Sequence, residues 1–165
     1  MIVVIFMLSL SLLVGCSIDS STQNGGQNNP EQGKEETENN DSQKEITTMY
    51  LLINGNKLEV TLAKNSSVDA LIELLQQDDI TYTADDYGGF EKVGGIGHTL
   101  PRNDTQIKTE AGDVILYQGN QICLFVGSNS WSYTRIGKIN GYTVSELRNL
   151  LCAGEGSIQV TISLK

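Results

Sequence analysis

The feature that most constrains the fold is an alternation of apolar and polar side chains, which runs through most of residues 47 to 165. Met49 to Asn54 and Lys57 to Ala63 are both rich in apolar residues, and the pair Asn54-Gly55 lies between them. Side chains of a strand point alternately to opposite faces, so a period of two residues predicts strands with one buried face. Asn and Gly both tolerate a positive φ, and together they predict a tight hairpin turn.

The same region contains two changes of period that predict short helices. Ser66, followed by Asp69 three residues later, resembles a capping box, and apolar residues at helical spacing follow. Thr143 and Glu146 have the same spacing ahead of a second apolar stripe. Further strands are predicted at about residues 80–84, 106–108, 113–118, 121–126, 130–136 and 158–164.

Regularly spaced strands with two helices indicate a mainly β domain that forms a barrel or closed sheet. We expect the last strand to pair with the first, because closure removes exposed strand edges. Residues 87–98 are rich in glycine and predict a long loop, of the kind that often carries function in a compact domain. Residues 47–165 have the usual length of one domain.

The order of these elements, together with two longer segments, resembles the bacterial cyclophilin-like domain family. The segments are Ala111-Gly112-Asp113-Val114-Ile115-Leu116-Tyr117 and Trp131-Ser132-Tyr133-Thr134-Arg135-Ile136-Gly137-Lys138-Ile139. This family consists of small proteins with a cyclophilin-type β-barrel and no settled activity. The resemblance therefore implies a closed β-barrel with two short α-helices over residues 47–165, and it implies no particular reaction.

The first sixteen residues form an uncharged, mostly apolar run that ends in Leu13-Val14-Gly15-Cys16. A membrane-spanning helix needs about 20 apolar residues, whereas a shorter run that ends in small residues is typical of a processed signal peptide. The final four residues resemble the lipobox of bacterial lipoproteins. This resemblance implies that Cys16 is acylated and that it anchors the protein to the bacterial cell membrane, outside the cytoplasm. An ordinary secretory signal or a buried apolar helix is the alternative.

Residues 17–46 are mostly polar and predict a disordered tether, because such a segment buries too little apolar surface to offset its chain entropy. The formal net charge of the chain is −9. The tether has seven acids and two lysines, whereas residues 47–165 have thirteen acids and nine bases, so the domain is only moderately acidic. Basic residues are not clustered, which argues against binding of nucleic acid through its phosphates.

Aromatic residues near strand ends and in the glycine-rich stretch predict a small apolar cleft, and we expect this cleft to bind a peptide or a small ligand. An arginine could orient a carboxylate or a peptide carbonyl there, because its guanidinium presents several donors in one plane. In the alternative interpretation the tyrosines pack the barrel and Arg135 forms a structural ion pair. The predicted ligand-binding residues are Tyr87, Phe90, Arg102, Trp131, Tyr133 and Arg135.

Two other functions are compatible with the sequence. A prolyl isomerase of the cyclophilin class would carry Phe-His-Arg and Phe-x-x-Gln segments, and the sequence contains neither. An accessory role, in which the barrel docks on a membrane protein, needs no pocket. We predict no metal or cofactor, because His98 has no second histidine and the acids near it, Glu91 and Asp104, lie in a segment predicted to be flexible. Cys123 and Cys152 are either small buried hydrophobes or a disulfide pair.

Overall fold

The computed structural model describes residues 45–165, so the predicted signal segment, Cys16 and most of the predicted tether lie outside the described residues. The described part contains nine strands and two helices. Neither helix is long and apolar enough to cross a membrane. The elements are β1 (Thr48–Ile53), β2 (Asn56–Leu62), α1 (Ser66–Leu75), β3 (Ile80–Tyr87), β4 (Glu91–Gly95), β5 (Thr105–Lys108), β6 (Asp113–Tyr117), β7 (Gln121–Phe125), β8 (Ser130–Ile139), α2 (Val144–Leu150) and β9 (Ile158–Ser163).

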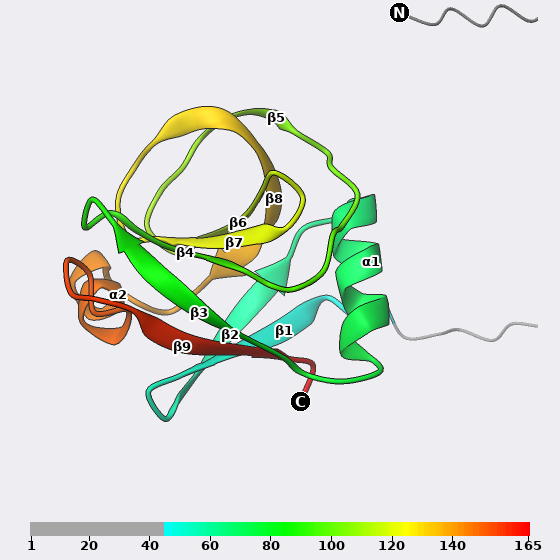
Figure 1. Ribbon diagram of the computed structural model, residues 1–165, viewed down its shortest axis with the longest axis horizontal. Helices are drawn as coiled ribbons and strands as arrows, with labels where there is room; N and C mark the ends of the chain where they lie inside the picture. The colour runs from blue at the N-terminus through cyan, green and yellow to red at the C-terminus, as the bar shows by residue number, and fades with distance from the viewer. Residues whose placement is uncertain (1–44) are drawn as a thin grey trace, which may run out of the picture. The chain divides into compact units, whose positions relative to one another are not determined.

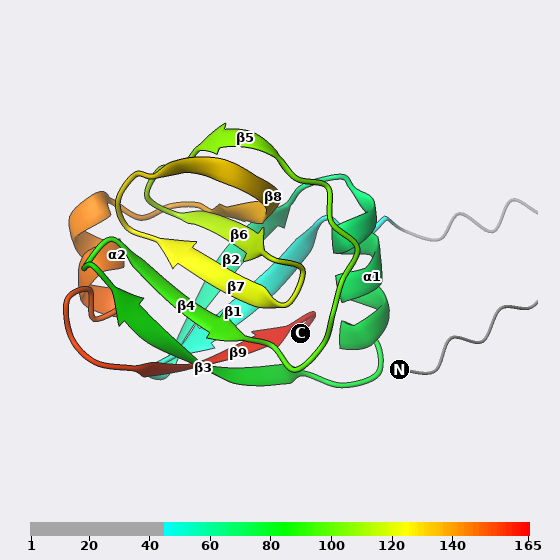
Figure 2. The same cartoon turned by 45° about the horizontal axis from the view of Figure 1, so that its top comes forward.

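The strands form a closed antiparallel barrel, as predicted. Their order is β2-β1-β9-β3-β4-β7-β6-β8, and a further pairing between β2 and β8 closes the barrel. Strand β5 lies outside this ring, paired with the first part of β8. The two helices lie at opposite ends of the barrel (Figures 1 and 2). The last strand, β9, pairs with β1 on one side and with β3 on the other, which confirms the predicted closing strand.

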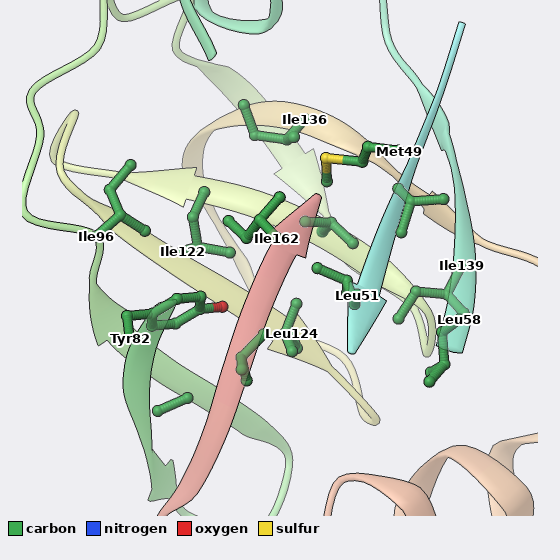
Figure 3. Packing of buried hydrophobic residues seen from close by; sticks show 14 of the residues in the cluster. Met49, Leu51, Leu58, Tyr82, Ile96, Ile122, Leu124, Ile136, Ile139 and Ile162 are labelled. Carbon is green, nitrogen blue, oxygen red and sulfur yellow. The ribbon is translucent and has the colours of Figure 1, made fainter. Parts of the chain in front are cut away.

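Strand alternation directs one set of apolar side chains into the barrel. In β1 the buried residues are Met49, Leu51 and Ile53, and the turn to β2 has φ values of 50° at Asn54 and 78° at Gly55. Figure 3 shows side chains from several strands meeting in this interior. The labelled members are Met49, Leu51, Leu58, Tyr82, Ile96, Ile122, Leu124, Ile136, Ile139 and Ile162.

Each helix begins at a residue whose side chain caps its first turn. The N-cap of α1 is Asn65 rather than Ser66, because the Asn65 side chain accepts hydrogen bonds from the amides of Ser67 and Val68. Its amide nitrogen also donates to the carbonyl oxygen of Arg135 at 2.8 Å, so the cap ties α1 to β8. The predicted capping box of α2, formed by Thr143 and Glu146, is confirmed. An amide side chain can both cap a helix and reach a distant strand, which a local pattern does not reveal.

The glycine-rich stretch is a hairpin, so the prediction of a long loop over residues 87–98 was wrong. Strand β3 continues to Tyr87 and pairs with Glu91, which leaves only a short turn between them. Within β4, a Cβ atom at Gly94 would overlap the backbone carbonyl oxygen of Thr83. This glycine therefore allows two backbones to approach closely within a sheet, a use of glycine that a strand accommodates.

A second, smaller apolar cluster lies on the outer face of the barrel. In β6 and β7 the residues Ile115, Cys123 and Phe125 point away from the main core and pack with Tyr133 of β8. Both faces of these strands are therefore covered, which explains why β6 and β7 are almost continuously buried. The first part of β8, with β5 beside it, extends beyond the closed ring (Figure 2).

Candidate functional site

A pocket of about 350 Å³ lies beside the outer cluster. It takes side chains from strands β3, β4, β6, β7 and β8, which antiparallel pairing places side by side. Its volume lies at the small end of the range of about 300–1,000 Å³ that ligand pockets occupy. The lining residues are Tyr87, Glu91, Val93, Tyr117, Gln121, Cys123, Asn129, Trp131 and Tyr133.

Aromatic rings form much of the wall. Tyr133 is only 5% exposed, and its ring packs edge-on against Tyr117 with the ring centroids 5.9 Å apart. The side-chain amide of Asn129 donates to the Tyr133 hydroxyl at 2.9 Å and holds that ring in place. Tyr87 and Trp131 also line the pocket but are 60% and 57% exposed. These two rings are therefore available to cover a bound molecule.

Glu91 is the one acidic residue among the described residues of the wall, and its surroundings are unfavourable for a charge. It is 8% exposed, and its Oε2 atom has no hydrogen-bond partner among the described residues. Burial raises the pKa of this carboxyl from 4.5 to about 7. A buried carboxyl without a donor has a large desolvation cost. A ligand that brings a donor to this carboxyl would remove part of that cost.

The neighbouring charged residue, Lys92, does not offset Glu91. It points to the opposite face of β4, where its ammonium donates to the carbonyl oxygens of Glu155 and Gly156 at 2.5 and 2.7 Å. It also pairs with Asp86, with 3.1 Å between Nζ and Oδ1. Lys92 thus joins the β3-β4 hairpin to the segment before β9. In the part of the chain that the structure describes, no lysine, arginine or histidine lines the pocket.

The structure brings three of the six predicted site residues together at the pocket, namely Tyr87, Trp131 and Tyr133. Phe90 is not part of the wall. Its ring packs beside the pocket, 5.7 Å from the ring of Tyr87 and 6.3 Å from that of Phe125. Phe90 therefore packs against Tyr87, which lines the pocket, without lining the pocket itself.

The two predicted arginines lie elsewhere and are engaged in ion pairs. Arg102 is exposed and forms a salt bridge with Asp104, whose other oxygen accepts from Thr134 at 2.6 Å. Arg135 donates to the buried Asp113 at 2.6 Å, as in the alternative interpretation of this residue. Lys138 donates to the same Asp113 oxygen at 3.0 Å. Both arginines are thus held by carboxylates and contribute nothing to the pocket wall.

The sequence-based prediction did not include the other six lining residues, which are Glu91, Val93, Tyr117, Gln121, Cys123 and Asn129. Glu91 directly follows Phe90 in the sequence, but its burial depends on the pairing of β4 with β7, where it lies opposite Phe125. A local signal for Glu91 does exist. Glu91 and Lys92 are adjacent, so in a strand their side chains must point to opposite faces and cannot pair with each other. That signal is usable only once the segment is assigned to a strand rather than a loop.

The remaining candidates are less suited to bind a ligand. A larger hollow of about 780 Å³ lies between residues 45–47 and α1, and its charged Lys64 and Glu45 side chains pair with each other at 2.8 Å in solvent. His98 is exposed. Among residues 45–165, no group of three or more His, Cys, Asp or Glu side chains is placed to hold a metal ion. Cys123 and Cys152 are both free thiols.

The fold and the pocket define a small antiparallel β-barrel with an aromatic-walled cavity on its outer face. The family model described as the cyclophilin-like family matches residues 51–163, and the chain belongs to this family. A comparison with curated proteins gave no match.

Two solved structures have a similar fold. The hypothetical protein AF2241 from Archaeoglobus fulgidus has a TM-score of 0.54 and 18% identity, over 75% of this chain and 99% of that one. A structure of McbB in complex with tryptophan has a TM-score of 0.50 and 17% identity, over 70% of this chain and 44% of that one. At these identities the likeness concerns the fold alone.

Proposed function

We propose that this protein is a lipid-anchored, extracytoplasmic binding domain, and that the pocket on the outer face of its barrel takes a small ligand or a peptide side chain. The observation that carries the proposal is the combination of aromatic walls with a buried carboxyl that lacks a partner. Rings supply a large contact area, and one polar group fixes the orientation of the bound molecule.

Binding without catalysis is favoured by the position of the arginines. A cyclophilin-type isomerase would use an arginine beside its proline pocket, whereas Arg102 and Arg135 are paired with Asp104 and Asp113 away from the cavity. We therefore expect the full chain to leave the cis-trans exchange of a proline-containing peptide unchanged, with a true cyclophilin as the positive control. Catalysed exchange that disappears in Arg102→Ala or Arg135→Ala would contradict this expectation.

The binding proposal is tested by a screen of small molecules and short peptides. Trp131 is the single tryptophan of the chain and lines the pocket, so its fluorescence reports on this site alone. Genuine ligands should change that fluorescence and raise the melting temperature of the wild type. They should lose both effects in Val93→Phe, which adds a ring within the wall. If no compound in the screen binds, the pocket is not a ligand site and docking on a membrane protein becomes the better account.

The anchoring part of the proposal rests on the lipobox-like end of the apolar run at Cys16. Cells that express the full chain and are fed a labelled fatty acid should incorporate the label into this protein. Cys16→Ser should lose the label and leave the membrane fraction. Label that persists in Cys16→Ser would place the modification elsewhere and refute this part.

A further inference from the structure

The charge of the pocket wall limits which ligands it can take. Among the lining residues within 45–165, Glu91 is the only one that carries a carboxyl, and none is a lysine, arginine or histidine. The other titratable groups that face the pocket are Tyr87 from β3, Tyr117 from β6, Cys123 from β7 and Tyr133 from β8. Phenols and thiols are either neutral or negative, so none of the described lining residues brings a positive charge to pair with an anion.

The rings around the pocket also favour positive charge. An aromatic face carries partial negative charge, and a cation within about 6 Å of a ring centroid is attracted to it. Tyr87, Trp131, Tyr117 and Tyr133 all contribute rings to the wall. The carboxyl and the rings therefore act in the same direction.

The hydrogen-bonding state of Glu91 adds a further requirement. Its Oε2 atom is buried and accepts no hydrogen bond among the described residues. A quaternary ammonium could neutralise the charge but has no N–H group to donate. A primary or secondary ammonium supplies both the charge and the donor, which makes a shorter and stronger hydrogen bond to a carboxylate than a neutral donor does.

We infer that the pocket binds a protonated amine, with Glu91 as its counter-charge and hydrogen-bond acceptor and with the aromatic rings around the attached organic group. This inference rests on the proposed binding function and names its ligand class. Free arylalkylamines and the side chain of a lysine share the chemistry that the wall recognises. The cavity of about 350 Å³ has room for either.

Amine binding should be coupled to the proton of Glu91. Burial raises the pKa of this carboxyl to about 7, so near neutral pH a bound ammonium must displace a proton from part of the molecules. Below about pH 7 the proton competes with the amine, and the affinity should fall by up to about tenfold for each pH unit. A neutral ligand of the same shape should show no such fall.

The test uses the purified full chain and three probes that share a phenethyl group: phenethylamine, phenethyl alcohol and trimethylphenethylammonium. Binding is followed by Trp131 fluorescence and by calorimetry. We expect phenethylamine to bind about tenfold or more tightly than the alcohol, with the quaternary probe between them. We also expect the affinity for phenethylamine to fall about tenfold or more in Glu91→Gln. It should be unchanged in the control Glu73→Gln, which removes an exposed acid on α1.

The outcomes separate the ligand class from the binding function. If the alcohol binds as tightly as the amine, or if Glu91→Gln keeps the amine affinity, the inferred ligand class is wrong while the binding pocket stands. If none of the three probes binds, the amine inference is also wrong, and the wider screen then decides whether the pocket binds anything. The pH dependence uses only the wild type, so it remains decisive even if Glu91→Gln fails to fold.

Discussion

Replacing Glu91 by glutamine should change how the stability of the protein depends on pH. In the unfolded chain a glutamate titrates near its usual pKa of 4.5, whereas burial in the pocket raises the folded-state pKa to about 7. Between these two values the folded protein holds a proton that the unfolded chain has lost. Stability therefore falls as the pH rises through this window, and it levels off above the folded-state pKa.

The size of the effect follows from the displacement of the pKa. One pH unit corresponds to 1.36 kcal/mol at 25 °C, so the shift from 4.5 to about 7 amounts to a loss of about 3 kcal/mol in the free energy of unfolding. Glutamine has nearly the same shape and does not titrate. The stability of Glu91→Gln relative to the wild type should therefore rise by about 3 kcal/mol from below pH 4.5 to above pH 7.

Urea denaturation at a series of pH values, followed by Trp131 fluorescence, measures this difference directly. Glu73→Gln, which removes an exposed carboxyl, should show a nearly constant difference from the wild type over the same range. The reasoning would be refuted if Glu91→Gln behaved like this control. Such a result would mean that Glu91 remains as well solvated in the folded protein as in the unfolded chain.

Three further substitutions test the packing, each by urea denaturation. Gly137→Ala places a Cβ against the carbonyl oxygen of Thr61 where the barrel closes, and it should lower the free energy of unfolding by about 1–3 kcal/mol. A neutral effect would show that the packing at this closure is loose. Tyr82→Phe removes a buried hydroxyl that has no partner among the described residues and should stabilise the protein by about 1 kcal/mol. A loss of stability instead would reveal a partner for that hydroxyl. Lys92→Met leaves Asp86 without its buried cation and should lower the free energy of unfolding by about 3 kcal/mol. An unchanged urea midpoint would contradict a structural role for this lysine.

Much of the fold could be read from local patterns. The turn at Asn54-Gly55 and the capping box at Thr143 depend on residues close together in sequence, and the structure confirms both. The alternation over residues 158–164 predicts a strand locally, and its expected pairing with the first strand, which is a long-range contact, is also confirmed. The family resemblance is confirmed over residues 51–163. The β3-β4 hairpin was missed because its glycines were interpreted as loop residues. Gly94 is instead a strand residue that leaves room for the backbone of Thr83 on the neighbouring strand, and no local pattern shows this contact.

The candidate site was predicted only in part, for the same reason. Aromatic character near strand ends was enough to select Tyr87, Trp131 and Tyr133, since rings of this kind often border ligand sites. It did not separate Arg135 from them, because Trp131, Tyr133 and Arg135 are spaced two apart and a strand places such residues on one face. Arg135 differs because Asp113 of the neighbouring strand captures its guanidinium.

By itself, the sequence determined the alternation of the strands, the positions of most turns and helix starts, and hence a closed barrel. These depend on backbone preferences and on side-chain spacing, which act over a few residues. Only the tertiary structure decided that Glu91 is buried and that its carboxyl lies among rings from other strands. The pocket is made by strands that meet through sheet pairing, so the environment of its carboxyl, and with it the pKa and the inferred ligand, exists only after the barrel has formed.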